Sequence, residues 1–306
     1  MIQMLQQITG PVFEYLAENK LLIQLARKVG LPLGGTLFVG GQGAEETLDT
    51  VKQFNQDGRA ATVDCLGEFI ETEQDAVEIA NECIKVIGQI KAYDLDAQVS
   101  LKLTSIGLRI DPDIAYQQLR RIAEVADQQN MRVTVNMEEA MMVESIVRVF
   151  ERVHEHYPNV GIALQANVYR SRFDLERLQA TVRVVKGAYD GDDEIYIQPK
   201  KTVDETYLQL VKINLLEGNY TQIATHDEQV IQQIIDFTQM EQIDPSRFEF
   251  QMFQGMRPKR QQELVRQGYR VVIYVPHGLD WYTYLMRRLA ERPANIAFTV
   301  GAMLRR

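Results

Sequence analysis

Cysteine is scarce in this 306-residue sequence, which contains only Cys65 and Cys83 and no CxxC pair. Two cysteines cannot build a disulfide framework, and this favours a reducing compartment. Positive charge is also scarce, with 33 Lys and Arg against 42 Asp and Glu and a net charge of −9. That balance argues against a nucleic-acid partner, because phosphate backbones select for basic surfaces.

Long apolar runs and targeting signals are missing as well. No window holds the ~18 uncharged apolar residues that a membrane span requires. The first twenty residues, MIQMLQQITGPVFEYLAENK, contain neither a basic leader nor a long apolar stretch. We therefore expect a soluble, cytoplasmic protein, and a peripheral contact with the inner face of the membrane stays compatible with the sequence.

The sequence does contain a repeated alternation of short β-branched runs with longer amphipathic segments. Strands are predicted at residues 61–64, 99–103, 132–136, 161–165, 182–185, 220–225, 248–252 and 270–274. Helices are predicted at residues 11–29, 45–56, 73–92, 112–129, 139–156, 172–179, 203–217, 228–240, 258–267 and 279–292, and Pro293 stops the last of them.

Eight strands that alternate with helices indicate parallel pairing through right-handed crossovers. Eight such units favour a closed barrel over an open sheet, so the predicted fold class is α/β, a TIM-type (β/α)8 barrel. The barrel is expected to occupy residues 45–300, after an N-terminal helical extension at 1–44, with the last helix over its mouth. No linker or shift of composition divides the chain, which predicts a single domain.

Hydrogen-bonding or charged side chains stand at or near the end of nearly every predicted strand. In TIM-type barrels the chemistry lies at these carboxyl ends. A single such residue means little, since loops begin there anyway, but a whole series predicts a polar pocket. The series comprises Asp64, Lys102, Asn136, Glu138, Gln165, Arg183, Lys186, Thr225, His226, Gln251 and Tyr274.

The last predicted helix carries a second cluster. Tyr284, Arg287, Arg288 and Glu291 follow one another at i, i+3, i+4 and i+7, which places them on one stripe. A solvated basic patch with an Arg–Glu pair explains this spacing as well as a binding site does. Adjacent arginines can nevertheless grip one carboxylate from two directions, and their planar forks suit that task.

Three further features predict ordinary structure. The glycines of VGGQGAEETL at 39–48 lack the GxGxxG and GK[ST] patterns, so they indicate a turn before a helix. Thr225 and Glu228 are spaced as a capping box, although Thr225 is an equally good candidate for a ligand. His154 and His156 face different ways on one helix, and no metal site is expected.

Taken together, these segments resemble the proline dehydrogenase family from about residue 36 to residue 300. The motifs that carry the resemblance are TVDCLGEF at 62–69, VSLKLTSIGL at 99–108, LQANVYRSR at 164–172, VRVVKGAY at 182–189, ATHDEQVI at 224–231, RFEFQMFQGMRP at 247–258 and YVPHGLDWYTYLMRRLAERP at 274–293. The last segment, with its aromatic-rich approach to a paired arginine, is the most specific.

The resemblance implies FAD bound non-covalently over the barrel mouth. Arg183 would lie near the flavin N5 edge and stabilise the reduced ring, and Gln165 would bond the ring system. Lys186, Thr225 and His226 would hold the rest of the cofactor. Further cofactor contacts are expected from Asn136, Val185, Gly187, Ala188 and Gln251.

The same resemblance implies oxidation of L-proline to Δ1-pyrroline-5-carboxylate, with electrons passed to a quinone and the product transferred to a separate pyrroline-5-carboxylate dehydrogenase. Lys102, Arg287 and Arg288 would pair with the substrate carboxylate, and Glu291 would orient Arg287. The residues expected to wall the substrate ring are Tyr189, Phe253, Tyr274 and Tyr284.

Two positions depart from the family pattern. Asn136 stands where the family typically has an aspartate, which puts a role as a base in doubt, and Glu138 is the carboxylate that could replace it. Asn167 stands where many relatives carry an aromatic residue.

Three other functions stay open at this point. A hydroxyproline dehydrogenase would use the same scaffold, but the bulk of Tyr274 disfavours a substrate hydroxyl. A Schiff-base lyase or aldolase would use Lys102 or Lys186 as its nucleophile. A non-catalytic binding barrel is disfavoured by the retained arginine pair and VKGAY.

Overall fold

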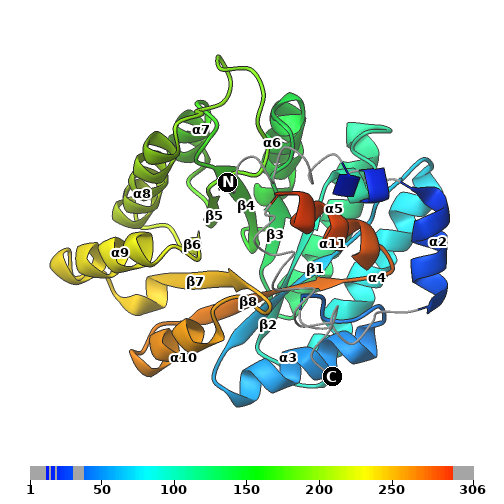
Figure 1. The fold of residues 1–306 in the computed structure, drawn as a ribbon, viewed down its shortest axis with the longest axis horizontal. Helices are drawn as coiled ribbons and strands as arrows, with labels where there is room; N and C mark the ends of the chain where they lie inside the picture. The colour runs from blue at the N-terminus through cyan, green and yellow to red at the C-terminus, as the bar shows by residue number, and fades with distance from the viewer. Residues whose placement is uncertain (1–11, 14, 18, 30–37, 292–306) are drawn as a thin grey trace.

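The computed structural model describes residues 12–13, 15–17, 19–29 and 38–291. Its centre is a closed barrel of parallel strands in chain order, with the last strand paired to the first, as Figure 1 shows. The strands are β1 (Ala60–Cys65), β2 (Ala97–Lys102), β3 (Val133–Asn136), β4 (Val160–Gln165), β5 (Val182–Val185), β6 (Thr221–Ala224), β7 (Phe248–Phe253) and β8 (Val271–His277). The predicted TIM-type α/β barrel is confirmed.

Helices surround the barrel and follow the predicted segments to within a few residues, except that the predicted helix at 11–29 is interrupted at Asn19. They are α2 (Lys20–Val29), α3 (Ala44–Gln56), α4 (Glu73–Ala92), α5 (Pro112–Gln128), α6 (Ala140–His154), α7 (Ser171–Leu178), α8 (Lys200–Leu216), α9 (Glu228–Met240), α10 (Pro258–Arg266) and α11 (Trp281–Glu291), with 3₁₀ turns η2 (Thr104–Ile106) and η3 (Pro245–Arg247). One strand differs from expectation, because β8 continues past Tyr274 to His277, where it still pairs with Cys65 of β1.

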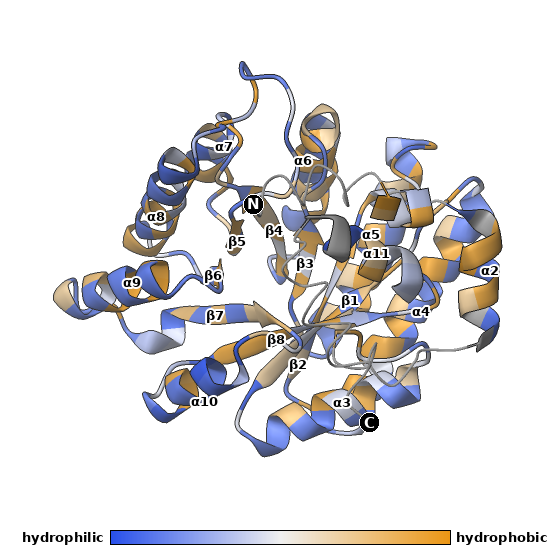
Figure 2. Ribbon diagram, viewed as in Figure 1, coloured by the Kyte–Doolittle hydropathy of each residue, from blue (hydrophilic) through white to orange (hydrophobic). Residues whose placement is uncertain are grey.

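The apolar core lies between the barrel and the helices. Outward-facing strand residues such as Val63, Leu101 and Val135 are fully buried in it, and Cys65 and Cys83 belong to it as free thiols. The helices around it carry both hydrophobic and hydrophilic residues, as the colouring of Figure 2 shows. Burial of each Val or Leu side chain contributes roughly 1.5–3 kcal/mol, so this layer is the main source of stability.

The barrel interior is polar instead. Gln98 of β2 donates to Glu249 of β7 at 2.7 Å, and Gln222 of β6 donates to Gln98 at 3.2 Å. Thr134 of β3 donates to Gln222 at 3.1 Å. These bonds cross the barrel, which is possible only for inward-facing side chains. The cause is strict alternation along the strands, since every second residue of a strand faces inward.

The start of α9 corrects one prediction. Asp227 is the N-cap, and its carboxylate accepts from the backbone N–H groups of Gln229 and Val230 at 3.1 and 3.5 Å. The hydroxyl of Thr225 accepts from the backbone N–H of Asp227 at 3.1 Å instead. The predicted capping box of Thr225 and Glu228 is therefore wrong, because the helix begins at Glu228 and Thr225 lies too early to cap it.

The glycine-rich segment forms the predicted turn before a helix. Gly43 is the N-cap of α3, and Gly41 bridges to His277 of β8. A Cβ at Gly41 would lie 2.5 Å from the Cβ of Glu46, so only glycine permits this close approach of the turn to the helix.

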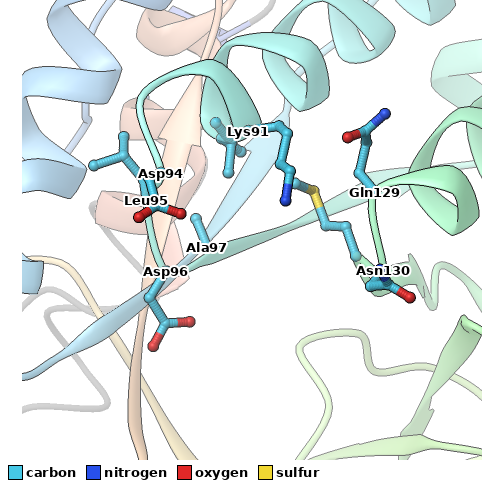
Figure 3. Close-up of a pocket in the computed structure, with 9 residues that line it drawn as sticks. Lys91, Asp94, Leu95, Asp96, Ala97, Gln129 and Asn130 are labelled. Atoms are coloured by element: carbon cyan, nitrogen blue, oxygen red, sulfur yellow. The ribbon is translucent and has the colours of Figure 1, made fainter.

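A hollow of about 190 Å³ lies at the amino ends of β2 and β3, where α4 and α5 end (Figure 3). Lys91, Asp94, Asp96, Gln129 and Asn130 are among the residues that line it. It is at the opposite end of the barrel from the predicted polar pocket and contains none of the predicted site residues.

Candidate active site

Arg183 is buried beneath the mouth of the barrel. Its Nη1 donates to Oδ1 of Asn136 at 2.7 Å, and its Nη2 donates to Oγ1 of Thr62 at 3.3 Å. Burial lowers the pKa of Arg183, and the nearby groups Tyr274 and Asp64 oppose that shift. Because a guanidinium stays charged in proteins, a positive charge is fixed at this depth.

Asn136 links this charge to a carboxylate. Its Nδ2 donates to Oδ1 of Asp64 at 2.7 Å and to the hydroxyl of Tyr274 at 3.2 Å, while its carbonyl oxygen faces Arg183. An aspartate at this position would place a second carboxylate against Asp64, and one of the two would then need a proton. Asparagine joins Arg183 and Asp64 without that added charge.

Glu138 points to a different partner. Its two carboxylate oxygens accept from the backbone N–H of Thr104 at 3.2 Å and from the Thr104 hydroxyl at 2.6 Å. Burial raises the pKa of Glu138, more than the Thr104 hydrogen bonds and the charge of Lys102 lower it. The carboxylate in contact with Asn136 is Asp64, which belongs to the predicted polar series at the strand ends but was assigned no role in binding cofactor or substrate.

The raised pKa of Glu138 gives a pH-dependent prediction. The stability that its protonated form contributes is fully present below the unfolded pKa of about 4.3 and is lost as pH rises through the folded value. Glu138→Gln removes this loss, so the melting temperature of the variant relative to wild type should be higher at about pH 8 than at about pH 4. Thermal unfolding at both pH values measures the difference, with the neighbouring, half-buried Glu139→Gln as control. A difference independent of pH would contradict the prediction.

Arg287 and Lys102 hold one carboxylate between them. Nη1 of Arg287 lies 3.1 and 3.0 Å from the two oxygens of Glu68, and Nζ of Lys102 donates to the same carboxylate at 3.3 Å. Burial lowers the pKa of Lys102, but Glu68, Tyr189 and Glu138 outweigh burial and the net shift is upward. Two of the three cations predicted to bind a substrate carboxylate, Lys102 and Arg287, therefore contact a carboxylate of the protein itself.

Aromatic rings connect Arg288, which follows Arg287 on α11, to the barrel interior. The guanidinium carbon of Arg288 lies 5.6 Å from the ring centre of Phe253 and 5.7 Å from that of Tyr284. Phe253 meets the ring of Tyr274 edge to face at 5.2 Å, and Tyr274 lies 5.5 Å from the guanidinium carbon of Arg183. Three of the four rings that the resemblance assigns to the substrate wall thus form a continuous series from α11 down to Arg183, and their contact with a substrate stays a prediction.

Lys186 and His226 lie on the other side of the mouth. Nζ of Lys186 contacts Asp227 at 3.0 Å and Asp204 at 2.5 Å, at the starts of α9 and α8. Nε2 of His226 accepts from the backbone N–H of Phe253 at 2.9 Å, and the two rings stack at 5.4 Å. That hydrogen bond requires Nε2 to be unprotonated, so the histidine acts here as an acceptor that fixes the end of β7.

Among the buried polar atoms of the mouth that have no protein partner in the described part of the chain are Nε of Arg183, a donor, and Oε1 of Gln251, an acceptor. Gln165, by contrast, donates to the backbone oxygen of Glu138 at 2.9 Å. Because buried polar groups are almost always hydrogen-bonded, this pair of atoms fits a bound group that offers both an acceptor and a donor.

The turn after β5 is held by Asn167. Its backbone N–H donates to Lys186 and its side-chain Nδ2 donates to the backbone oxygen of Tyr189, at 3.1 and 2.7 Å. Gly187 has a φ of +100°, and a Cβ there would lie 1.8 Å from Oδ1 of Asn167. Asparagine at 167 and glycine at 187 are therefore matched to each other.

Gly187→Ala is expected to destabilise the protein by at least about 2 kcal/mol, since strain at positive φ costs about 1–3 kcal/mol and the overlap with Asn167 adds to it. Gly268→Ala is the matched control, because φ there is +87° and no atom lies within 4 Å of the added Cβ. Denaturant unfolding of both variants separates backbone strain from overlap. Equal losses in the two would contradict the proposed match with Asn167.

The structure gathers most of the predicted residues at one end of the barrel. Val185 is half-buried at the end of β5, and Ala188 is exposed in the following turn. The side chain of Glu291 lies outside the described part of the chain, so its predicted bond to Arg287 stays a prediction. Sequence reasoning missed Glu68, although the motif TVDCLGEF contains it.

Fold and site together define a (β/α)8-barrel protein with a cluster of cationic and aromatic side chains at the carboxyl ends of its strands. Residues 47–300 match the family model described as "Proline dehydrogenase". "Proline dehydrogenase 1" of Bacillus subtilis subsp. natto is 40% identical over 298 residues, which cover 96% of this chain and 99% of that protein. "Proline dehydrogenase" of Deinococcus radiodurans is 36% identical over 310 residues, which cover 99% of this chain and 100% of that one. The chain therefore belongs to the proline dehydrogenase family.

Solved structures agree on the fold. Proline utilization A (PutA) from Bdellovibrio bacteriovorus, described as inactivated by N-propargylglycine, superimposes with a TM-score of 0.77 at 22% identity. The match covers 84% of this chain but 32% of that one, so the chain spans about a third of the solved PutA chain.

Proposed function

We propose that this protein is an FAD-dependent proline dehydrogenase that oxidises L-proline to Δ1-pyrroline-5-carboxylate. The observation that carries the proposal is the carboxylate grip, in which Arg287 and Lys102 already hold the carboxylate of Glu68. A substrate carboxylate offers the same group to the same cations, and Arg288 stands beside it over the ring of Phe253.

The residues present fit FAD. Its isoalloxazine ring offers hydrogen-bond acceptors and an N–H donor, which match the unpartnered Nε of Arg183 and Oε1 of Gln251. Arg183, Gln165, Asn136 and Gln251 would hold the ring. Lys186, Thr225 and His226, with Val185, Gly187 and Ala188, would hold the remainder. When bound there, FAD supplies the acceptor for the hydride that leaves the substrate.

The chain's own residues then have three tasks. The cations would fix the substrate carboxylate. This would orient the substrate carbon next to the ring nitrogen toward the bound cofactor. The rings of Tyr189, Phe253, Tyr274 and Tyr284 would pack on the apolar substrate ring and exclude water. Such alignment accounts for much of the rate in reactions where a cofactor supplies the chemistry. Arg183 would stabilise negative charge that develops above it.

The lysine-based alternative is disfavoured by the contacts of both lysines. A Schiff base needs a neutral amine. Lys102 is paired with Glu68 and its pKa is raised, and Lys186 is paired with Asp204 and Asp227. Hydroxyproline is disfavoured because the ring of Tyr274 lies against Phe253 at the place proposed for the substrate ring.

The proposal extends to the reaction partners by family resemblance. The electrons would pass to a quinone, reached by a peripheral contact with the inner face of the membrane, and the product would go to a separate pyrroline-5-carboxylate dehydrogenase. Among the helices that the structure describes, none combines the length and apolar character needed to cross a membrane.

The test is an assay of the purified protein with L-proline and a soluble dye as electron acceptor, with the product trapped by o-aminobenzaldehyde. We expect dye reduction and trapped product in equal amounts, and much slower reaction with 4-hydroxyproline. Equal rates with the two substrates would favour the hydroxyproline enzyme. The lyase would be favoured if no dye is reduced and if borohydride, added together with a carbonyl substrate, links that substrate covalently to a lysine of the protein.

A further inference from the structure

Glu249 is a fully buried carboxylate inside the barrel, below the proposed cofactor site. Its Oε1 accepts from Gln98 at 2.7 Å and from Gln251 at 2.6 Å. Its Oε2 accepts from the hydroxyl of Tyr220 at 2.8 Å and from Arg270 at 3.3 Å. Four donors, of which Arg270 is also the ionic partner, satisfy the charge, which explains how a carboxylate is tolerated with 0% exposure.

This carboxylate dictates which way the amide of Gln251 is turned. A carboxylate can only accept, so the atom of Gln251 that faces Glu249 has to be Nε2. The reversed amide would bring two oxygens to 2.6 Å. Oε1 of Gln251 is therefore turned away from Glu249, and it has no donor in the described part of the protein. Gln251 follows Glu249 by two residues on the same side of β7, which places it nearer the mouth.

We propose that Glu249 is a positioning residue for FAD, and this inference rests on the proposed function. By fixing the amide of Gln251, it presents a carbonyl oxygen to an N–H donor of the cofactor. The oxidised isoalloxazine ring has one ring N–H, at N3, and this is the donor we assign to Gln251. Gln222 of β6 is in register with Arg183 on one side and with Glu249 on the other, so Glu249 lies at the level of the arginine that is proposed to contact the flavin ring.

The test compares binding of FAD and of FAD methylated at N3 to the apoprotein, followed by flavin fluorescence. N3 methylation would leave the buried oxygen of Gln251 without a donor, which weakens binding by about fivefold to a hundredfold, so wild type should prefer FAD by at least about fivefold. In Glu249→Gln the amide of residue 251 is free to turn, and we expect FAD affinity to fall about tenfold and the preference to shrink to about twofold.

Tyr220→Phe is the matched control, because it removes another donor to Glu249 and leaves the contact with Gln251 in place. We expect it to lower the melting temperature of the apoprotein and to keep the preference for FAD. This separates orientation of Gln251 from general loosening of the polar interior.

Retention of the wild-type preference by a folded Glu249→Gln variant would overturn the inference, as would equal binding of the two flavins by wild type. If Glu249→Gln does not fold, the test uses Gln251→Met. This variant should bind FAD and N3-methylated FAD equally well, and a wild-type preference for FAD in Gln251→Met would also overturn the inference. A wild-type protein that binds neither flavin would overturn the proposed function itself, and the inference with it.

Discussion

Replacing Arg287 by methionine is expected to raise the KM for L-proline by about tenfold to a hundredfold. A hydrogen bond to a charged group is worth about 1.5–3 kcal/mol, and each 1.4 kcal/mol is a factor of ten. Arg287 contacts both oxygens of a carboxylate in the present structure, so its loss should weaken the grip on the substrate more than it disturbs the barrel.

Steady-state kinetics over a wide range of L-proline concentrations measures this effect. Arg148→Met is the matched control, because Arg148 forms an exposed ion pair with Glu144 on α6 and should leave KM unchanged. FAD affinity of Arg287→Met should stay at the wild-type value, since no cofactor contact is assigned to Arg287. A KM within twofold of wild type would remove Arg287 from the substrate site.

Arg183→Met is expected to slow reduction of the bound flavin by L-proline by about 10²–10³-fold. Removal of one preorganised group that stabilises developing charge has effects of this size. Arg183 is suited to the role because it is buried and its fork is held by Asn136 and Thr62. Its positive charge is thus in place before the reaction and needs no rearrangement.

Stopped-flow absorbance under anaerobic conditions gives the reduction rate at full flavin occupancy. Arg183→Lys keeps the charge without the planar fork, and we expect it to recover part of the rate. If Arg183 had only a structural role, Arg183→Met would have a lower melting temperature, but its bound flavin would be reduced at a rate near that of wild type. That result would contradict the assigned role.

The strands and their order were predictable because strand and helix periodicities differ and repeat. The polar barrel interior could also have been predicted, from an alternation of apolar and polar residues within the strands that the sequence analysis did not use. The segments AQVSLK and FEFQMF alternate apolar and polar residues, whereas a strand buried on both faces is usually apolar throughout. That alternation places Gln98 and Glu249 inside the barrel, well below the strand ends where polar residues were expected.

The partners of the site residues were not predictable. Glu68 meets Arg287 across 219 residues of sequence, and nothing local links a loop after β1 to the last described helix. The same holds for Asn136, whose neighbour Asp64 lies on a strand two places away in the barrel. Glu138 was expected to supply the carboxylate missing at position 136, because it lies two residues further on the same side of the strand. The hydroxyl and N–H of Thr104 hold its carboxylate instead.

The most direct test of the central claim is the visible spectrum of the purified protein, recorded anaerobically before and after addition of L-proline. We predict a flavin spectrum that L-proline bleaches and 4-hydroxyproline bleaches poorly. A flavin spectrum that L-proline leaves unchanged would contradict the proposed substrate. A colourless protein that takes up no added FAD would contradict the proposed function as a whole.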